Sequence, residues 1–338
     1  MMITKCFRNY LKKGGLVLML SIASVLSFGL IVDANAQQPL IFNESMFNTM
    51  LINPAYTGTR EVFTVSALGR RQWVGINGAP TSESISANSP LRRSKSSMGF
   101  NLMNEHFGVT SRTGLYYNYA YRIKVGNGRG GIRNKGRGPG IGKLSFGMSG
   151  GFDLRFSDWT NVVTGDPINS DPEFYYDSGT KFEPNFGAGA YFNNDKYYIG
   201  LSIPRFLLWS DNPKEQSNEL SVRLGDIAYY LIAGAVYDLS REVKVRPSIL
   251  FKWLPNSSFQ ADFNTNLIFK ERYTIGATYR TSSSFAVLAQ IYITRQFSFG
   301  YSYDYSFSEL RGFSSGSHEI LLQYEFGFNI KSSNPRYF

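Results

Sequence analysis

Apolar and polar residues alternate with a period of two along much of this chain. In residues 115–125, LYYNYAYRIKV, one set of alternate positions is aliphatic or aromatic, and the other carries amide, small and cationic groups. Successive side chains of a β-strand point to opposite faces. The segment is therefore expected to be a strand with one apolar face, Leu115, Tyr117, Tyr119, Tyr121, Ile123 and Val125, and one polar face that includes Arg122 and Lys124.

About fourteen segments share this character. They are 62–70, 81–89, 96–105, 113–125, 144–154, 185–193, 196–204, 226–237, 243–252, 259–269, 273–280, 285–294, 297–306 and 317–328. A soluble β-sandwich or lipocalin-like barrel also alternates, but it would have to bury all of these aromatic faces in one core. Because the opposite faces are rich in Gly, Ser, Asn and Arg, we predict an all-β fold, an antiparallel transmembrane β-barrel of the outer membrane with about 14 strands.

The connections between these segments support the same fold. Outer-membrane barrels have an even number of strands, short periplasmic turns and longer outer loops. Short polar turns are expected at 193–195, 239–242, 270–272 and 295–296, and long polar loops at 157–184 and 205–225. Three connections depart from the rule. Connections 254–258 and 281–284 are short although they fall on the outer side, and 126–143 is long although it falls on the periplasmic side.

The first 36 residues have the form of a secretory signal peptide. A basic stretch ending at Lys13 precedes the apolar residues 16–32, and Ala34-Asn35-Ala36 predicts cleavage before Gln37. An uncleaved membrane anchor is the alternative, since this apolar stretch is close to the length of a span. Cleavage would remove the single cysteine, Cys6, together with four cations and one anion, which lowers the net charge from +10 to +7.

Beyond residue 36, no apolar run is long enough for a membrane-spanning helix. The best one, Tyr229–Tyr237, suits a tilted strand. An integral protein of this kind would have to be a barrel, because only helices and closed barrels satisfy their backbone hydrogen bonds in lipid.

The sequence offers no convincing catalytic or cofactor motif. Residues 126–131 match G-x-G-x-x-G, but the residues that follow cannot begin the helix that dinucleotide binding requires. His106 and His318 fall at strand ends, where interfacial polar residues are ordinary. The acidic stretch 166–177 is either a solvated loop or a weak calcium site. We therefore expect a protein that is not an enzyme, with no cofactor and no metal site.

A basic, glycine-rich stretch within 126–143 has two readings. Its cations, Arg129, Arg133, Lys135 and Arg137, belong either to a solvated insertion or to a contact with an anionic partner or headgroup. The strand count places this stretch on the periplasmic side. Since the chain is predicted to be secreted, nucleic acid is not an expected partner.

A series of short motifs in residues 42–151 is distinctive as an ordered set. Its main members are Asn53, Pro54, Ala55, Tyr56 and Gly58, then Arg71, Gln72 and Trp73, then Gly78, Ala79 and Pro80. The set resembles the PorP/SprF family of Bacteroidetes outer-membrane proteins, which is tied to type IX secretion and gliding motility. The insertion at 126–143 departs from the shorter connection expected in that family.

The resemblance and the pattern together suggest four parts. We expect a signal peptide at 1–36, a plug, lid or simple cap at 37–61, the barrel at 62–328 and a tail at 329–338. Pro54 restricts Asn53 to an extended conformation, and Gly58 permits a positive φ before the first strand.

The resemblance implies a role in the export or surface attachment of secreted proteins. Clients would carry C-terminal sorting domains and contact loops 157–184 and 205–225, while the periplasmic side would contact other components of the machinery. The alternative is a passive outer-membrane pore or small-molecule channel.

Overall fold

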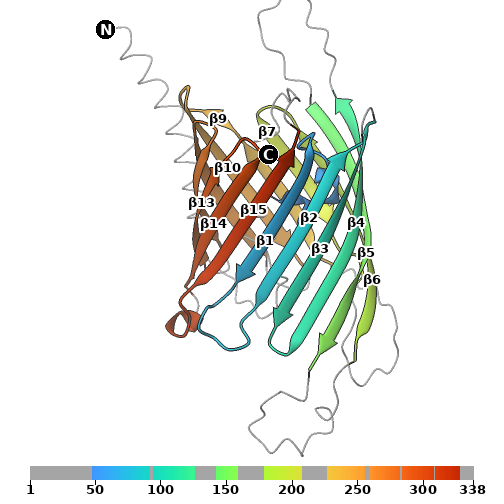
Figure 1. Cartoon of the computed structure of the whole chain (residues 1–338), viewed down its shortest axis with the longest axis vertical. Coiled ribbons are helices and arrows are strands. Elements are labelled where there is room, and N and C mark those ends of the chain that lie inside the picture. Colours follow the sequence, from blue (N-terminus) through green and yellow to red (C-terminus); the bar gives the residue numbers. More distant parts are fainter. Residues whose placement is uncertain are drawn as a thin grey trace, which may run out of the picture. The chain divides into compact units, whose positions relative to one another are not determined.

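The strands of the protein form one antiparallel sheet that closes on itself. The computed structural model describes residues 48–91, 94–125, 142–158, 179–207, 227–255, 259–281, 284–307 and 309–327. The predicted signal peptide and the predicted tail at 329–338 lie outside these residues. Neighbours in sequence are neighbours in the sheet, and β1 pairs with the last strand, β15. Figure 1 shows the tilted strands side by side around the barrel.

The strands follow the predicted segments closely. They are β1 (Phe63–Arg71), β2 (Thr81–Pro90), β3 (Ser96–Phe107), β4 (Thr110–Val125), β5 (Gly142–Ser157), β6 (Lys181–Asn193), β7 (Tyr197–Ile203), β8 (Tyr229–Ala235), β9 (Tyr237–Asp238), β10 (Val243–Trp253), β11 (Gln260–Phe269), β12 (Tyr273–Arg280), β13 (Ser284–Tyr292), β14 (Phe297–Ser306) and β15 (Ser317–Phe326). Since β8 and β9 both pair with β10, they count as one strand of the wall. The prediction of a 14-strand barrel is confirmed in the part of the chain that the structure describes.

The interruption between β8 and β9 has a local cause. Opposite β10, the pairing stops after Gly234, which faces Ser248, and resumes at Tyr237, which faces Val245. Pro247 lies in this gap on β10 and has no backbone N–H to donate to a neighbouring strand. The gap does not change the register, so the two pieces continue one strand.

The alternation in β4 places its apolar face outside the barrel. Leu115, Tyr117 and Tyr119 are all more than 40% exposed, whereas Tyr116 and Asn118 are buried. The same phase holds in β14, where Phe299 and Tyr301 face outward and Ser302 is fully buried. A barrel with an apolar outside and a polar interior is the arrangement that a membrane requires.

Several strand boundaries differ from the prediction by two to four residues, and the end of β5 and the start of β6 are the clearest case. Strand β5 continues to Ser157 and β6 begins at Lys181, so the ends of the predicted loop 157–184 are strand. The pairing of Arg155 with Lys181 and of Leu154 with Phe182 extends both strands. An ion pair between Arg155 and Glu183, with 2.5 Å between the charged atoms, holds the two strands together inside this extension. The alternation continues through this stretch, with Leu154 and Phe156 facing outward and Arg155 inward, so the predicted strand ended too early.

Helical structure in the described ranges is limited to short 3₁₀ turns, η2 (Thr49–Leu51), η3 (Pro54–Tyr56) and η8 (Glu309–Gly312). None of the helices in these ranges has the length and apolar character to cross a membrane. The first two turns precede β1 and belong to the site described next.

Candidate functional site

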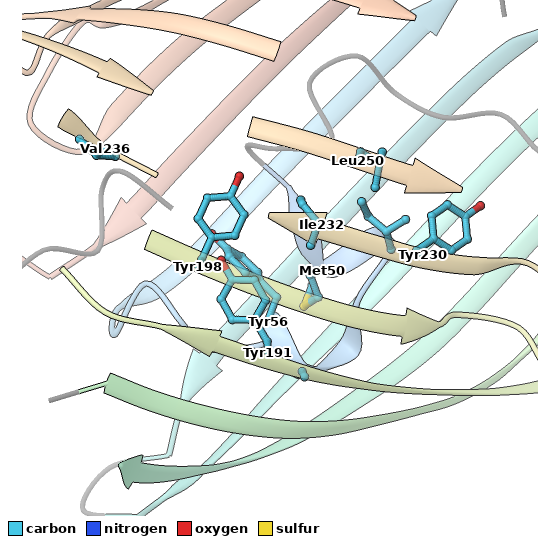
Figure 2. Close-up of a cluster of buried hydrophobic side chains, with 10 residues drawn as sticks. Met50, Tyr56, Tyr191, Tyr198, Tyr230, Ile232, Val236 and Leu250 are labelled. Carbon is cyan, nitrogen blue, oxygen red and sulfur yellow. The ribbon is translucent and has the colours of Figure 1, made fainter. Parts of the chain in front are cut away.

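Residues 48–61, here called the lumen segment, lie against the inward faces of the barrel strands. Met50, Ile52, Ala55 and Tyr56 are buried, and they form one apolar cluster with inward-facing residues of β6, β7, β8 and β10. Figure 2 shows this cluster, in which the wall contributes Tyr191, Tyr198, Tyr230, Ile232, Val236 and Leu250. The ring of Tyr56 meets that of Tyr191 edge to face, with 5.4 Å between centroids.

The lumen segment also reaches the opposite wall. Leu51 packs against a second buried cluster, formed by Leu68 of β1, Leu288 of β13 and Leu321 of β15. In the order of strands around the barrel, these lie on the far side from β7 and β8. The segment therefore crosses the lumen between two apolar clusters.

Asn53 fixes the turn in this segment and anchors it to the wall. Its Oδ1 accepts a hydrogen bond from the Ala55 N–H at 2.9 Å, which caps η3, and Pro54 occupies the first position of that turn. Its Nδ2 donates to the carbonyl oxygens of Ala190 at 3.1 Å and Leu201 at 3.3 Å. As predicted, the residue before the proline is extended, with φ −135°.

Polar side chains of the wall hold the backbone of the segment at further points. Ser202 donates to the Ile52 carbonyl at 2.7 Å, and Asn88 accepts from the Gly58 N–H at 3.1 Å. Asn48 of the segment in turn donates to Ser86 at 2.7 Å. Hydrogen bonds from side chains satisfy an irregular backbone that cannot join the sheet.

Gly147 of β5 lets the segment approach the wall closely. A Cβ at this position would lie 2.3 Å from the backbone nitrogen of Ala55, closer than van der Waals contact allows. Ala55 itself is completely buried. The wall is thus shaped to receive this stretch of the chain.

Polar contacts hold the last residues of the segment, where the chain continues toward β1. Arg122 of β4 donates to the carbonyl oxygens of Gly58 at 2.9 Å and Thr57 at 3.2 Å, and to Thr59 Oγ1 at 3.1 Å. Gly58 has the predicted positive φ, +70°. The adjoining residues make two ion pairs, Arg60 with Glu325 of β15 at 2.6 Å and Glu61 with Lys143 of β5.

The second half of the sequence motif builds the loop at the other end of β1. The Gln72 N–H donates to the Pro80 carbonyl at 2.9 Å, which closes the loop before β2 begins. The Trp73 N–H donates to Ser317 Oγ at 3.2 Å, and the Gly108 N–H donates to the Gly78 carbonyl at 2.9 Å. Loop 72–80 is therefore bonded to the start of β15 and to the β3–β4 connection. Two other motif residues flank these contacts, Arg71 exposed at the end of β1 and Ala79 next to Pro80.

Ion pairs inside the barrel bridge the strands where the sheet closes. Arg70 of β1 contacts Glu319 of β15 at 2.9 Å and Asp304 of β14 at 3.0 Å. Arg280 of β12 contacts Asp262 of β11 at 2.9 Å and approaches Asp304 at 3.7 Å. The Arg70 pairs join strands far apart in sequence, whereas those of Arg280 join β12 to its neighbour β11 and to β14.

A further cation enters the lumen from the chain that follows β7. Arg205 lies over the ring of Tyr116 at 5.8 Å and is 3.7 Å from the Asp153 carboxylate. Burial by itself lowers the pKa of Arg205, but the charge of Asp153 outweighs it and raises that pKa above its ordinary value. Arg205 therefore stays charged inside the protein.

The two histidines lie on the outer face of the barrel and belong to different strands. The register runs from His106 through Thr81 and Arg71 to His318, so β2 and β1 lie between them. At a strand spacing of about 4.8 Å, they are roughly 14 Å apart. This separation disfavours a shared catalytic site.

The remaining sequence candidates fall elsewhere. Arg129, Arg133, Lys135 and Arg137 lie outside the described residues, as does the acidic stretch 166–177. Within the described ranges, no group of three or more His, Cys, Asp or Glu residues is placed to hold a metal ion. Sequence reasoning missed the roles of Arg70 and Gly147, since pairing across the barrel and close approach to the segment leave no local signal.

Comparison with known proteins gives one family. The model of the type IX secretion system membrane protein PorP/SprF family matches residues 34–324. No curated protein matches the chain. Among solved structures, the Acinetobacter baumannii outer membrane protein Omp33 is 8% identical with a TM-score of 0.41, covering 79% of this chain and 99% of that one. A mutant Rh. blastica porin (9% identity, TM-score 0.34) and the KdgM porin in complex with oligogalacturonate (10%, 0.33) each cover 78% of this chain and 99% of their own.

Proposed function

Because the chain belongs to the PorP/SprF family of type IX secretion system membrane proteins, we propose that it is a non-enzymatic anchor of that machinery, with a closed lumen. The barrel holds it in the outer membrane. Its outer loops engage secreted or surface proteins that carry C-terminal sorting domains, and its periplasmic end contacts the rest of the machinery. The protein helps to export or attach those clients without chemical change.

The observation that carries the proposal is the lumen segment. It crosses the interior between two apolar clusters on opposite walls, and its backbone is bonded to wall side chains. A passive pore needs a continuous aqueous path, which an apolar cluster with edge-to-face tyrosines opposes. This favours an anchor over the alternative of a small-molecule channel.

The outer loops provide a second argument for a binding role. Loop 72–80 is bonded to the β3–β4 connection and to the β14–β15 loop, with the Val74 N–H donating to the Gly316 carbonyl at 2.9 Å. Phe313 in that loop is 78% exposed, and Phe307 is 53% exposed. Ordered loops with exposed aromatic side chains are typical of protein-binding surfaces.

The test is deletion of the gene, followed by complementation with the full chain. We expect one or a few surface proteins to disappear from the cell surface, while uptake of small hydrophilic solutes stays unchanged. Complementation should restore the missing proteins. Normal surface proteins together with reduced solute uptake would contradict the anchor and favour the channel.

Co-purification gives an independent check. In mild detergent, the full-length protein isolated from outer membranes should carry with it periplasmic secretion components and a client with a C-terminal sorting domain. Recovery of the barrel alone, under conditions that keep other secretion complexes intact, would count against the scaffolding role.

A further inference from the structure

We propose that the lumen segment is a releasable plug, that Arg122 is the latch that holds it, and that its release opens an aqueous path through the barrel. The inference rests on the proposed function, because it concerns the same closed lumen. It adds a conformational state in which the anchor conducts.

The attachments of the segment divide it into two parts. Residues 48–56 pack through apolar side chains, with Met50 and Tyr56 in the larger cluster. Residues 57–61 are held by polar contacts with Arg122, Asn88, Glu325 and Lys143. Thr57, Thr59 and Arg60 are as buried as the apolar part, but Glu61 and its partner Lys143 are partly exposed, so water reaches the segment at this end. On release, a polar contact exchanges for hydrogen bonds to water at little net cost, whereas exposing an apolar side chain costs hydrophobic free energy. The second part is therefore where release would begin.

The backbone of the second part favours movement. Gly58 has φ +70° and Glu61 has φ +59°, so two residues within four positions adopt the left-handed conformation. For a residue other than glycine, this conformation is uncommon and costs free energy, which its surroundings must supply. Glu61 is held by its ion pair with Lys143 and by the hydrogen bond from its N–H to the Gly58 carbonyl at 3.1 Å. Loss of the polar contacts would relieve this strained turn.

Arg122 makes three of the hydrogen bonds that hold this part. Its guanidinium bonds to three consecutive residues, 57, 58 and 59, and to Ser145 of the adjacent strand at 3.1 Å. It is partly exposed, so solvent reaches it from the rim. A single charged side chain therefore controls the point where the segment leaves the lumen.

The surface that release would uncover can hold water. The wall under the segment includes Ser86, Asn88, Asn101 and Ser202, whose side chains now bond to the segment. Even the larger apolar cluster consists partly of tyrosines, which carry a hydroxyl group. A tyrosine has an apolar ring and a hydroxyl group that can bond to water, so this lining tolerates water better than an aliphatic one.

The first experiment measures access to the segment. Thr49 is 2% exposed, and Cys6, before the predicted cleavage site, is the only native cysteine. Thr49→Cys combined with Cys6→Ser in the full chain therefore supplies a unique thiol for a small water-soluble maleimide. We expect Arg122→Gln to raise the labelling rate about tenfold, as for the loss of one hydrogen bond to a charged group.

Arg112→Gln is the matched control, because Arg112 lies on the same inward face of β4, ten positions away. No hydrogen bond or ion pair found in the described residues joins it to the lumen segment. Equal labelling rates in Arg122→Gln and Arg112→Gln, whether slow or fast, would show that Arg122 does not hold the segment in place. Heat-modifiable migration on gels checks that each variant has folded.

The second experiment measures conductance and does not depend on the Arg122 variant. Asn48 and Ser86 touch through their side chains, so Asn48→Cys with Ser86→Cys can fix the segment by an engineered disulfide. In planar lipid bilayers, we expect brief openings of the protein when the disulfide is reduced and none when it is oxidised. Identical currents in both states, or no current in either, would refute release. The anchor role would survive that result, since surface display of clients is measured separately.

Discussion

Replacing Asn53 by alanine should loosen the lumen segment without altering the strands. Asn53 is 1% exposed and makes three hydrogen bonds, one to the Ala55 N–H and two to the carbonyl oxygens of Ala190 and Leu201. Each buried hydrogen bond contributes about 0.5–1.5 kcal/mol net, and the Ala55 N–H would be left without its partner. We therefore expect Asn53→Ala to lower the free energy of unfolding by about 2–4 kcal/mol.

The assay is guanidinium unfolding of the protein in lipid vesicles, followed by tryptophan fluorescence. Asn104→Ala is the control, because Asn104 is exposed on the outer face of β3, accepts one exposed hydrogen bond from Thr113 at 3.1 Å, and should change stability by less than about 1 kcal/mol. Labelling of Thr49→Cys should also accelerate in the Asn53→Ala background. If Asn53→Ala matches Asn104→Ala in stability and leaves the thiol protected, Asn53 does not hold the segment.

Three further variants test other parts of the structure. Arg70→Met should cost about 3–5 kcal/mol in unfolding measurements, because it leaves the buried Glu319 carboxylate without its cation. Arg71→Met, at the exposed neighbouring position, should be nearly neutral by the same measurement. Tyr119→Arg places a cation on the lipid-facing side and should reduce membrane insertion by about 2–4 kcal/mol, seen as loss of the heat-modifiable band. Gly78→Val should leave the barrel folded but make loop 72–80 sensitive to protease, since Gly78 has φ +71°; an equally resistant loop would contradict this.

The barrel could be predicted because its signal is local. In β4, every residue on the outward face from Leu115 to Val125 is aliphatic or aromatic, while the inward face is mixed, so the sequence indicates both the strand and which face is outside. The prediction placed Tyr117 outside and Asn118 inside, as the structure does. Where the polar positions near a strand end are charged, as at Arg155 and Lys181, the predicted strands ended too early although the alternation continues.

The site could be predicted only in part, because its contacts are not local. Asn53-Pro54 and Gly58 indicated a fixed turn before the first strand, and the structure has that turn. The sequence left a plug, a lid and a cap as alternatives. The contact of Gly147 with Ala55 could not be predicted. Nothing in the sequence near β5 shows that the backbone of Ala55, more than ninety positions earlier, lies where a side chain at 147 would be.

The motif residues gain a common explanation from their place in the chain. Residues 48–80 form one continuous unit: the lumen segment, then β1, then loop 72–80. Strand β1 closes the sheet against β15, and buried ion pairs hold both of its ends there, Arg60 with Glu325 and Arg70 with Glu319. A change in the position of the lumen segment therefore acts directly on the strand that carries loop 72–80. If clients bind at that loop and the machinery at the other end, β1 is the shortest covalent path between the two, which explains why the motif occupies both sides of it.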